Sequence, residues 1–303
     1  MLHINPVYLR ELKQTARMKK IIVLILIFNS LLALFGLFSF YLTFESAAQN
    51  NKIINYADML TIYAIISGIE FALLIFITPG ITAGAIAGER EKQTLDILLS
   101  TTMTPSQIIR GKLLASIHLM LILALSSLPV LAIVFSIGGI TFYELFELML
   151  LLLVTAIFIG SIGIFFSTLC KRSTIATVCT YTVVLLITGG LTMILLGNQL
   201  MGSLFETNIA YKSQIAEQIK VNESILFLLV NPIFSFASMI KDQIGMSLAT
   251  FATWKIKHQL TYYISQHWFY ISLFVQLLVS GLLIWIAGKK ITPSRSYRRI
   301  KTF

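Results

Sequence analysis

The sequence predicts an all-α polytopic membrane protein with six transmembrane helices, and three observations lead to this prediction. Of its 303 residues, 57% are hydrophobic and only 12% are charged, and the mean hydropathy is +0.86. Soluble domains carry about a quarter charged residues. Several apolar stretches reach the roughly 20 residues that a helix needs to cross a bilayer. Basic residues gather in the segments between alternate stretches.

Six hydrophobic stretches have the length of a membrane-spanning helix. A seventh, 225–240, is shorter and contains Asn231 followed by Pro232, so we expect it to be re-entrant or to lie at the outer surface. The six predicted spans are residues 21–42, 59–87, 113–137, 145–169, 175–197 and 268–288.

The basic residues orient the chain. With six spans and both termini inside, 17 of the 23 Lys and Arg residues lie in cytoplasmic segments. Cytoplasmic loops of membrane proteins carry such an excess. Topology and attraction to anionic lipids therefore explain the net charge of +10, and nucleic-acid binding is not expected. We expect a bacterial plasma-membrane protein whose N- and C-termini are both cytoplasmic.

The remaining segments flank the spans. Residues 1–20 are predicted to form an interfacial helix before the first five spans, which occupy 21–197. An external or re-entrant region follows at 198–267, with a polar helix at 210–220 and an aromatic-rich return at 251–263. The last span, 268–288, leads into a basic cytoplasmic tail at 289–303.

The interfacial helix is predicted from its capping residues and its periodicity. Pro6 suits the first helical position, where a missing N–H costs nothing. Apolar residues recur at every fourth position, while Arg10, Lys13 and Arg17 face elsewhere. Such a helix lies in the membrane interface with its apolar side toward lipid. It either anchors the chain there or also contacts a cytoplasmic partner.

The segment 88–112 is the longest charged stretch between two spans on the predicted cytoplasmic side. Leu95, Leu98 and Leu99 form an apolar stripe after Thr94, and this stripe is too short to cross a membrane. The stripe either enters lipid or docks a soluble protein, whose motion it would pass to both adjoining spans.

A second helix is predicted at the end of the same segment. Thr104 can cap it, Pro105 fills the first position and Gln107 completes a capping box. The helix then continues through Gly111 and Lys112 into the third span.

The segment 88–112 resembles the first cytoplasmic loop of permease subunits of type 2 ATP-binding-cassette (ABC) transporters. The family pattern is Glu-Arg-Glu, a Gly-Thr-Leu-Glu-Leu-Leu-Leu stretch, a Thr/Ser-Pro turn and a final Gly-Lys. The span count, the inside termini and the segment around Asn231 are also similar. Gln93 departs from the pattern, since the family often has Gly there. The matching residues are Glu89, Arg90, Glu91, Thr94, Leu95, Asp96, Leu98, Leu99, Thr104, Pro105, Gly111 and Lys112.

The resemblance implies that residues 1–303 form one permease domain. Residues 89–100 would be a coupling helix that docks on an ATPase subunit, and residues 5–20 a connecting helix beside it. Two such ATPase subunits would drive alternating access in a dimer of permease subunits, identical or paralogous. The family likeness implies that this complex is an exporter. ATP and Mg would bind to the ATPase partners, because this chain has no phosphate-binding loop and no cofactor of its own.

Small residues inside the spans predict close helix packing. Gly80, Gly84 and Gly88 recur at every fourth position in the cytoplasmic half of the second span. Small residues on one face of a helix allow a neighbour to approach closely. Gly160 and Gly163 in the fourth span are interpreted in the same way.

Polar residues inside the spans are few. Glu70 is the only acidic residue deep within a span, so we expect it to be protonated, hydrogen-bonded or facing a wet cavity. Asn29 is a milder case. A structural contact and a cavity-lining role both remain open for these two residues. The scattered histidines and cysteines predict no metal site, and no catalytic nucleophile is expected.

Three functions compete. An ABC transporter subunit is favoured over a stand-alone channel or ion-coupled carrier, because a carrier needs more intramembrane charge than Glu70 alone. An intramembrane enzyme is disfavoured, since no paired catalytic groups are visible. Spans rich in Phe, Leu, Ile and Met favour a hydrophobic or amphipathic substrate, such as a peptide, lipid or drug.

Overall fold

A computed structural model describes residues 6–49, 51, 53, 56–99, 104–136, 140–190, 192–193, 225–244, 264 and 267–291. Among these residues, six helical stretches are long and apolar enough to cross a membrane, which confirms the predicted fold class. The helix predicted at 210–220, the return at 251–263 and most of the basic tail lie outside the described residues. The chain divides into two compact units, Met1–Thr180 with Val279–Phe303 and Tyr181–Leu278.

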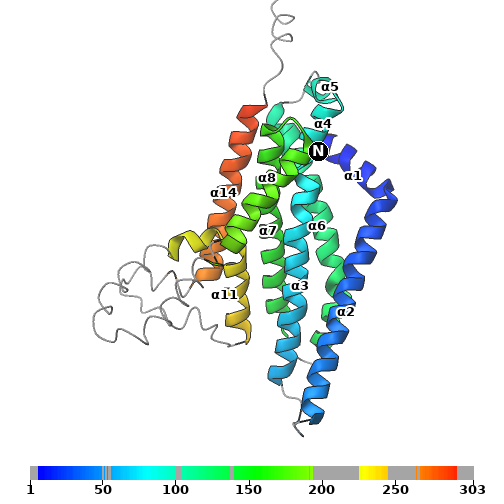
Figure 1. The fold of residues 1–303 in the computed structure, drawn as a ribbon, viewed down its shortest axis with the longest axis vertical. Helices are drawn as coiled ribbons and strands as arrows, with labels where there is room; N and C mark the ends of the chain where they lie inside the picture. Colours follow the sequence, from blue (N-terminus) through cyan, green and yellow to red (C-terminus); the bar gives the residue numbers. More distant parts are fainter. Residues whose placement is uncertain are drawn as a thin grey trace, which may run out of the picture. The chain divides into compact units, whose positions relative to one another are not determined.

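The first unit is a bundle of long helices. In Figure 1, α2, α3, α6 and α7 run alongside one another. α3 packs against α2, α6 and α7, and α6 packs against α1, α2 and α7. The helices that lie wholly in this unit are α1 (Pro6–Arg17), α2 (Lys19–Gln49), α3 (Tyr56–Thr82), α4 (Ala87–Glu91), α5 (Leu95–Leu99), α6 (Pro105–Ser136) and α7 (Phe142–Leu169). α8 (Ser173–Leu185) and α14 (Trp268–Lys290) each have residues in both units.

Two glycines on α7 lie close to the end of α3. A Cβ atom added at Gly163 would overlap Thr82 Oγ1 and would lie 3.2 Å from Ala83 N. A Cβ atom added at Gly160 would lie 3.5 Å from Thr82 Cγ2. The absence of side chains at these positions is therefore what lets α3 and α7 touch.

The glycines of the second span do not make a comparable contact. Gly80 is exposed, and a Cβ atom at Gly84 would lie 4.0 Å from Ser173 Cβ, which is ordinary van der Waals contact. At Gly88 the added atom would meet nothing within 4 Å. Close packing between these spans thus depends on the glycines of α7 rather than on those of α3 and α4.

Capping boxes begin two of the long helices. The box predicted for α6 is confirmed: Thr104 N donates to Gln107 Oε1 at 2.9 Å, and Gln107 N donates to Thr104 Oγ1 at 3.4 Å. A second box, which was not predicted from the sequence, begins α7. There Thr141 N donates to Glu144 Oε2 at 2.6 Å, and Glu144 N donates to Thr141 Oγ1 at 3.4 Å.

The second unit contains shorter elements. α8 continues into a π-helical turn, η1 (Leu186–Gly190), and a 3-10 helix, η2 (Ile225–Val230), precedes α11 (Pro232–Ile244). Asn231 Oδ1 accepts a hydrogen bond from Ile233 N at 3.0 Å, so Asn231 caps α11. Pro232 is the first residue of that helix. Neither η2 nor α11 is among the six membrane-length stretches found in the described residues, and their re-entrant placement stays a prediction.

Candidate functional site

The segment predicted to couple to a partner forms two short helices rather than one. A turn at Lys92 and Gln93 separates α4 from α5. Thr94 N donates to Glu89 O at 2.9 Å and Gln93 N donates to Arg90 O at 3.1 Å, the hydrogen-bond pattern of a Schellman motif. This motif requires a left-handed residue, and Gln93 adopts φ 57. The glycine common at this position in the resembling family would adopt that conformation without a side-chain clash.

A serine of α7 holds the entry to α4. A turn at residues 83–86 separates α3 from α4. Ser167 Oγ accepts hydrogen bonds from Ile86 N at 2.8 Å and from Ala87 N at 2.9 Å. These backbone groups stand at the start of a helix, where N–H donors lack partners within the helix. The fully buried Ser167 hydroxyl supplies the missing acceptor.

Glu89 joins α4 to two other helices through one lysine. Lys112 Nζ in α6 lies 3.1 Å from Glu89 Oε1 and 2.7 Å from Glu11 Oε1 in α1. The Lys112 side chain is only 6% exposed. Thr94 Oγ1 donates to the other carboxylate oxygen of Glu89. A buried ammonium group thus has a carboxylate on either side.

Arg90 binds the carboxyl end of α7. Its Nη1 donates to Cys170 O at 2.9 Å and its Nη2 donates to Thr168 O at 3.2 Å. The last carbonyl groups of a helix lack intrahelical partners and carry partial negative charge. The guanidinium group of Arg90 donates hydrogen bonds to these carbonyl groups and places a positive charge beside their partial negative charge.

Glu91 binds the amino end of α8. Its Oε1 accepts from Ser173 N at 3.1 Å and its Oε2 accepts from Ser173 Oγ at 2.6 Å. The positive end of the helix macrodipole favours a carboxylate there. Glu89, Arg90 and Glu91 therefore each connect α4 to a different part of the bundle. We call these three residues and their partners the charged joint.

The two faces of α5 have different environments. Leu95 is 8% exposed and belongs to the core of the first unit, whereas Leu98 is half-buried. Ile97 is 68% exposed. The structure describes no side chain for Asp96 or Leu99. The buried residues around Leu95 are Ile86, Ile109, Leu113, Ile164, Ala287 and Ile291.

The outward position of Ile97 was not identified from the sequence, although a signal for it was present. Leu95, Leu98 and Leu99 lie on one side of a helix because residues three and four apart share a face. A residue two positions after Leu95 lies on the other side. Helical periodicity alone could therefore have located Ile97.

α1 is a helix of the predicted amphipathic kind. Val7 is buried, whereas Arg10, Lys13 and Arg17 are exposed. α1 packs against α6, and Tyr8 Oη lies 3.5 Å from His118 Nδ1.

Glu70 and Asn29 both reach α6. Glu70 is fully buried, and its Oε1 lies 2.5 Å from Ser127 Oγ. Asn29 Nδ2 donates to Ser126 Oγ at 2.9 Å. Adjacent serines of α6 thus bind polar side chains of α3 and α2. Both contacts connect helices, and the cavity-lining role proposed for Glu70 and Asn29 stays a prediction.

Within the described residues, no three His, Cys, Asp or Glu side chains lie close enough together to hold a metal ion. Cys170 and Cys179 are free thiols. The groups assembled in the charged joint are suited to connecting helices through ion pairs and hydrogen bonds.

The long apolar helices define a multi-pass membrane protein with a charged joint between two of its spans. A family model described as ABC-2 family transporter protein matches residues 6–288, and the chain belongs to that family. The chain is thus a membrane permease component of an ABC transporter, and the family implies a separate ABC ATPase subunit as its partner. None of the curated proteins compared with the chain matches it significantly.

Proposed function

We propose that this permease works in an ATP-driven exporter of the plasma membrane, with both of its termini in the cytoplasm. Two ATPase subunits bind ATP and Mg²⁺, and a second permease subunit, identical or paralogous, completes the complex. Closure of the ATPase pair moves the spans between inward-facing and outward-facing states as rigid bodies.

The observation that carries this proposal is the two-sided environment of α5. Leu95 fastens one side of the helix to the core of the chain, while Ile97 is 68% exposed on the other side. An apolar side chain presented by an anchored helix is suited to enter a groove on another protein. We therefore place the ATPase contact at Ile97 and leave Leu95 as the anchor.

The charged joint supplies the route from α5 into the spans. Thr94 lies next to α5 and hydrogen-bonds Glu89, which pairs with Lys112 of α6. Arg90 and Glu91 bind the end of α7 and the start of α8. A displacement of α5 would reach several spans through short polar contacts, and such contiguous networks can carry coupling between distant sites.

The proposed substrate is hydrophobic or amphipathic. Among the described residues, most buried hydroxyl groups of the spans donate to carbonyl oxygens of their own helix, as Thr78 and Ser161 do, and Ser127 also contacts Glu70. Few polar groups are then left to recognise a hydrophilic molecule. A peptide, a lipid or a drug fits this apolar environment best.

The docking proposal is tested by co-purification of the chain with ABC ATPase subunits expressed beside it. Ile97→Glu should reduce the amount of co-purified ATPase at least tenfold, because a carboxylate cannot enter an apolar groove without a large desolvation cost. Ile53→Glu is the matched control, since Ile53 is also exposed, at 83%, and lies on the predicted outer side. Full retention of the ATPase by Ile97→Glu would refute docking at this position.

The exporter proposal needs a separate measurement. The purified complex in proteoliposomes should move a fluorescent amphipathic probe only when ATP and Mg²⁺ are present on the side of the ATPase subunits. Transport without ATP would exclude an ATP-driven mechanism, whatever the result for Ile97.

A further inference from the structure

One face of α1 is exposed and makes none of the contacts between helices described so far. Its inner face is occupied, because Val7 is buried and Glu11 binds Lys112 of α6. The exposed face carries Arg10, Lys13 and Arg17. Among the described residues, no carboxylate forms an ion pair with any of these three cations. The charge of Arg10 helps to lower the pKa of Glu89, so the exposed face carries an excess of positive charge that is only partly compensated.

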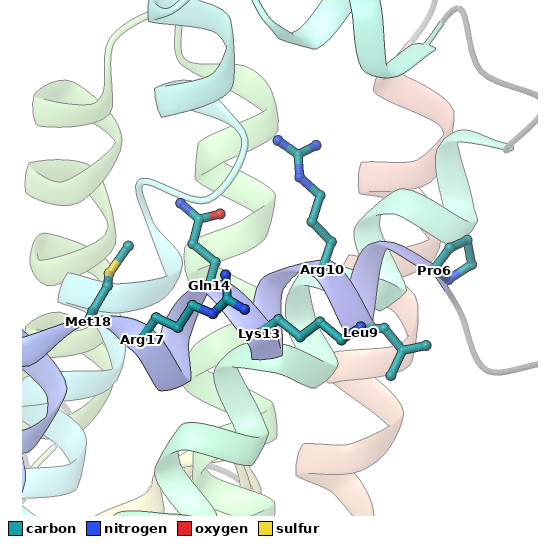
Figure 2. A pocket seen from close by; sticks show the side chains of 7 residues that line it. All are labelled: Pro6, Leu9, Arg10, Lys13, Gln14, Arg17 and Met18. Atoms are coloured by element: carbon teal, nitrogen blue, oxygen red, sulfur yellow. The ribbon is translucent and has the colours of Figure 1, made fainter.

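This face is hollowed. A shallow depression of about 710 Å³ follows α1 between Pro6 and Met18. Figure 2 shows Arg10 and Gln14 projecting from one side of the helix, Lys13 and Arg17 along the adjacent side, and Leu9 and Met18 toward opposite ends. Leu9 is 39% exposed and Met18 is 42% exposed. Cationic and apolar side chains thus line the same open surface.

The start of α2 adds a lipid-facing surface directly after the depression. α2 begins one residue after Met18, and its first turns expose apolar side chains. Ile22 is 59% exposed and Leu26 is 62% exposed. In a membrane-spanning helix such side chains face acyl chains. With α2 spanning the bilayer, we expect the basic depression to fall near the boundary between lipid headgroups and acyl chains.

We propose that this depression binds the headgroup of an anionic phospholipid, with Arg10, Lys13 and Arg17 on the phosphate group. Leu9 and Met18 contact the first part of the acyl chains. An amphipathic ligand matches this mixture of groups, because a basic helix face with apolar residues binds anionic membrane surfaces through both charge and apolar contact. The acidic surface of a protein partner would use the cations alone and is the competing occupant.

The test uses the full chain in a neutral detergent and short-chain dioctanoyl phosphatidylglycerol as the probe, with binding followed by native mass spectrometry. Dioctanoyl phosphatidylcholine and glycerol phosphate are the comparison ligands. We expect phosphatidylglycerol to bind at least tenfold more tightly than either of them. Equal binding of glycerol phosphate would identify a free-anion site and overturn the lipid proposal.

Two matched triple variants locate the binding. Replacement of Arg10, Lys13 and Arg17 by Gln should weaken phosphatidylglycerol binding about tenfold or more, since each basic residue near an anionic surface adds appreciable affinity. The control replaces three exposed basic residues elsewhere in the same unit, Lys171, Arg172 and Lys290, by Gln and should bind as the native chain does. Equal binding by the two triple variants would overturn the proposal.

Two further variants test the contributions of charge and of apolar contact separately. The double variant Arg10→Lys with Arg17→Lys preserves the charge and should retain most of the binding, which shows that misfolding is not the cause of a loss. The double variant Leu9→Ser with Met18→Ser should weaken phosphatidylglycerol binding without affecting glycerol phosphate. Because the chain is measured alone, this result is independent of the exporter proposal. If the Gln variant of Arg10, Lys13 and Arg17 binds phosphatidylglycerol as the native chain does but no longer co-purifies with the ATPase subunit, this face binds the protein partner instead.

Discussion

Carboxyl groups are held in two different ways in this bundle, in the charged joint and in the middle of the spans. Glu89 of the joint lies 3.1 Å from the ammonium group of Lys112 and also accepts from Thr94. Its side chain is 21% exposed. Glu70 of α3 is fully buried and hydrogen-bonds the uncharged side chain of Ser127.

The geometry at Ser127 shows how an uncharged carboxyl group would fit there. Ser127 Oγ lies 2.5 Å from Glu70 Oε1 and 2.6 Å from Ala124 O. A hydroxyl group has one proton and can donate fully to only one of these oxygens. If Glu70 is protonated, its own proton satisfies one contact while Ser127 donates to Ala124.

The comparison teaches that environment decides how the same chemical group is used. A charge is retained where a counter-ion and some solvent compensate its desolvation, whereas a carboxyl group in an apolar interior is more stable when neutral. We therefore expect the free energy of unfolding to depend on the charge of Glu89 in the charged joint and to depend little on the charge of Glu70.

The largest effect is expected for Lys112→Ala. The substitution leaves the carboxylates of Glu11 and Glu89 facing each other without their shared cation. We expect a loss of about 3 kcal/mol in the free energy of unfolding, because removal of one partner strands the others. Unfolding in detergent micelles measures it, and Lys92→Ala in the exposed turn is the control. If both variants unfold alike, the joint does not stabilise the chain.

A smaller loss, about 2 kcal/mol, is expected for Ser167→Ala. Two backbone N–H groups, those of Ile86 and Ala87, lose their acceptor. An unsatisfied buried donor costs about 1 to 3 kcal/mol. Ser161→Ala is the matched control, because Ser161 is equally buried but donates to Phe158 O of its own helix. Hydrogen exchange at residues 86 and 87 should increase only in the Ser167 variant.

Neutral isosteres test the comparison directly. Glu89→Gln removes the charge beside Lys112 and should lower the free energy of unfolding by about 1 kcal/mol. Glu70→Gln keeps a polar group beside Ser127 and should change it by less than about 0.5 kcal/mol. The same unfolding assay applies to both. A larger loss for the Glu70 variant would reverse the assignment of charge to the two regions.

A small gain in stability is expected from Gln93→Gly. Gln93 has φ 57, a conformation that costs a residue with a side chain about 1 kcal/mol more than glycine. The greater freedom of glycine in the unfolded chain offsets part of this relief. A net gain of about 0.5 kcal/mol should appear as a raised unfolding midpoint. Gln93→Val, β-branched at the same position, should lower it.

Local features of the fold were predictable because their causes are local. Thr104 and Gln107 lie three residues apart, so their capping box depends on a few neighbouring residues. The six spans follow from hydrophobic length in the same way. The turn at Gln93 had only an indirect signal, the glycine that the resembling family often has there.

The partners in the charged joint were not predictable in this way. Glu11 and Lys112 are 101 residues apart in the sequence, and Arg90 and Cys170 are 80 apart. No periodicity relates residues at such distances. Leu95 was expected on a partner-facing surface together with Leu98, but its burial depends on residues of three other helices.

By itself the sequence determined that this chain is a six-span helical membrane protein, and it located the segment between α3 and α6 as the one of interest. Hydrophobic length, charge distribution and caps are properties of consecutive residues. Tertiary structure alone decided that Glu89, Arg90 and Glu91 bind other parts of the chain, and that Ile97 rather than Leu95 faces outward. The physical reason is that ion pairs and burial depend on which helices lie side by side, and the long spans bring together residues that are remote in the sequence.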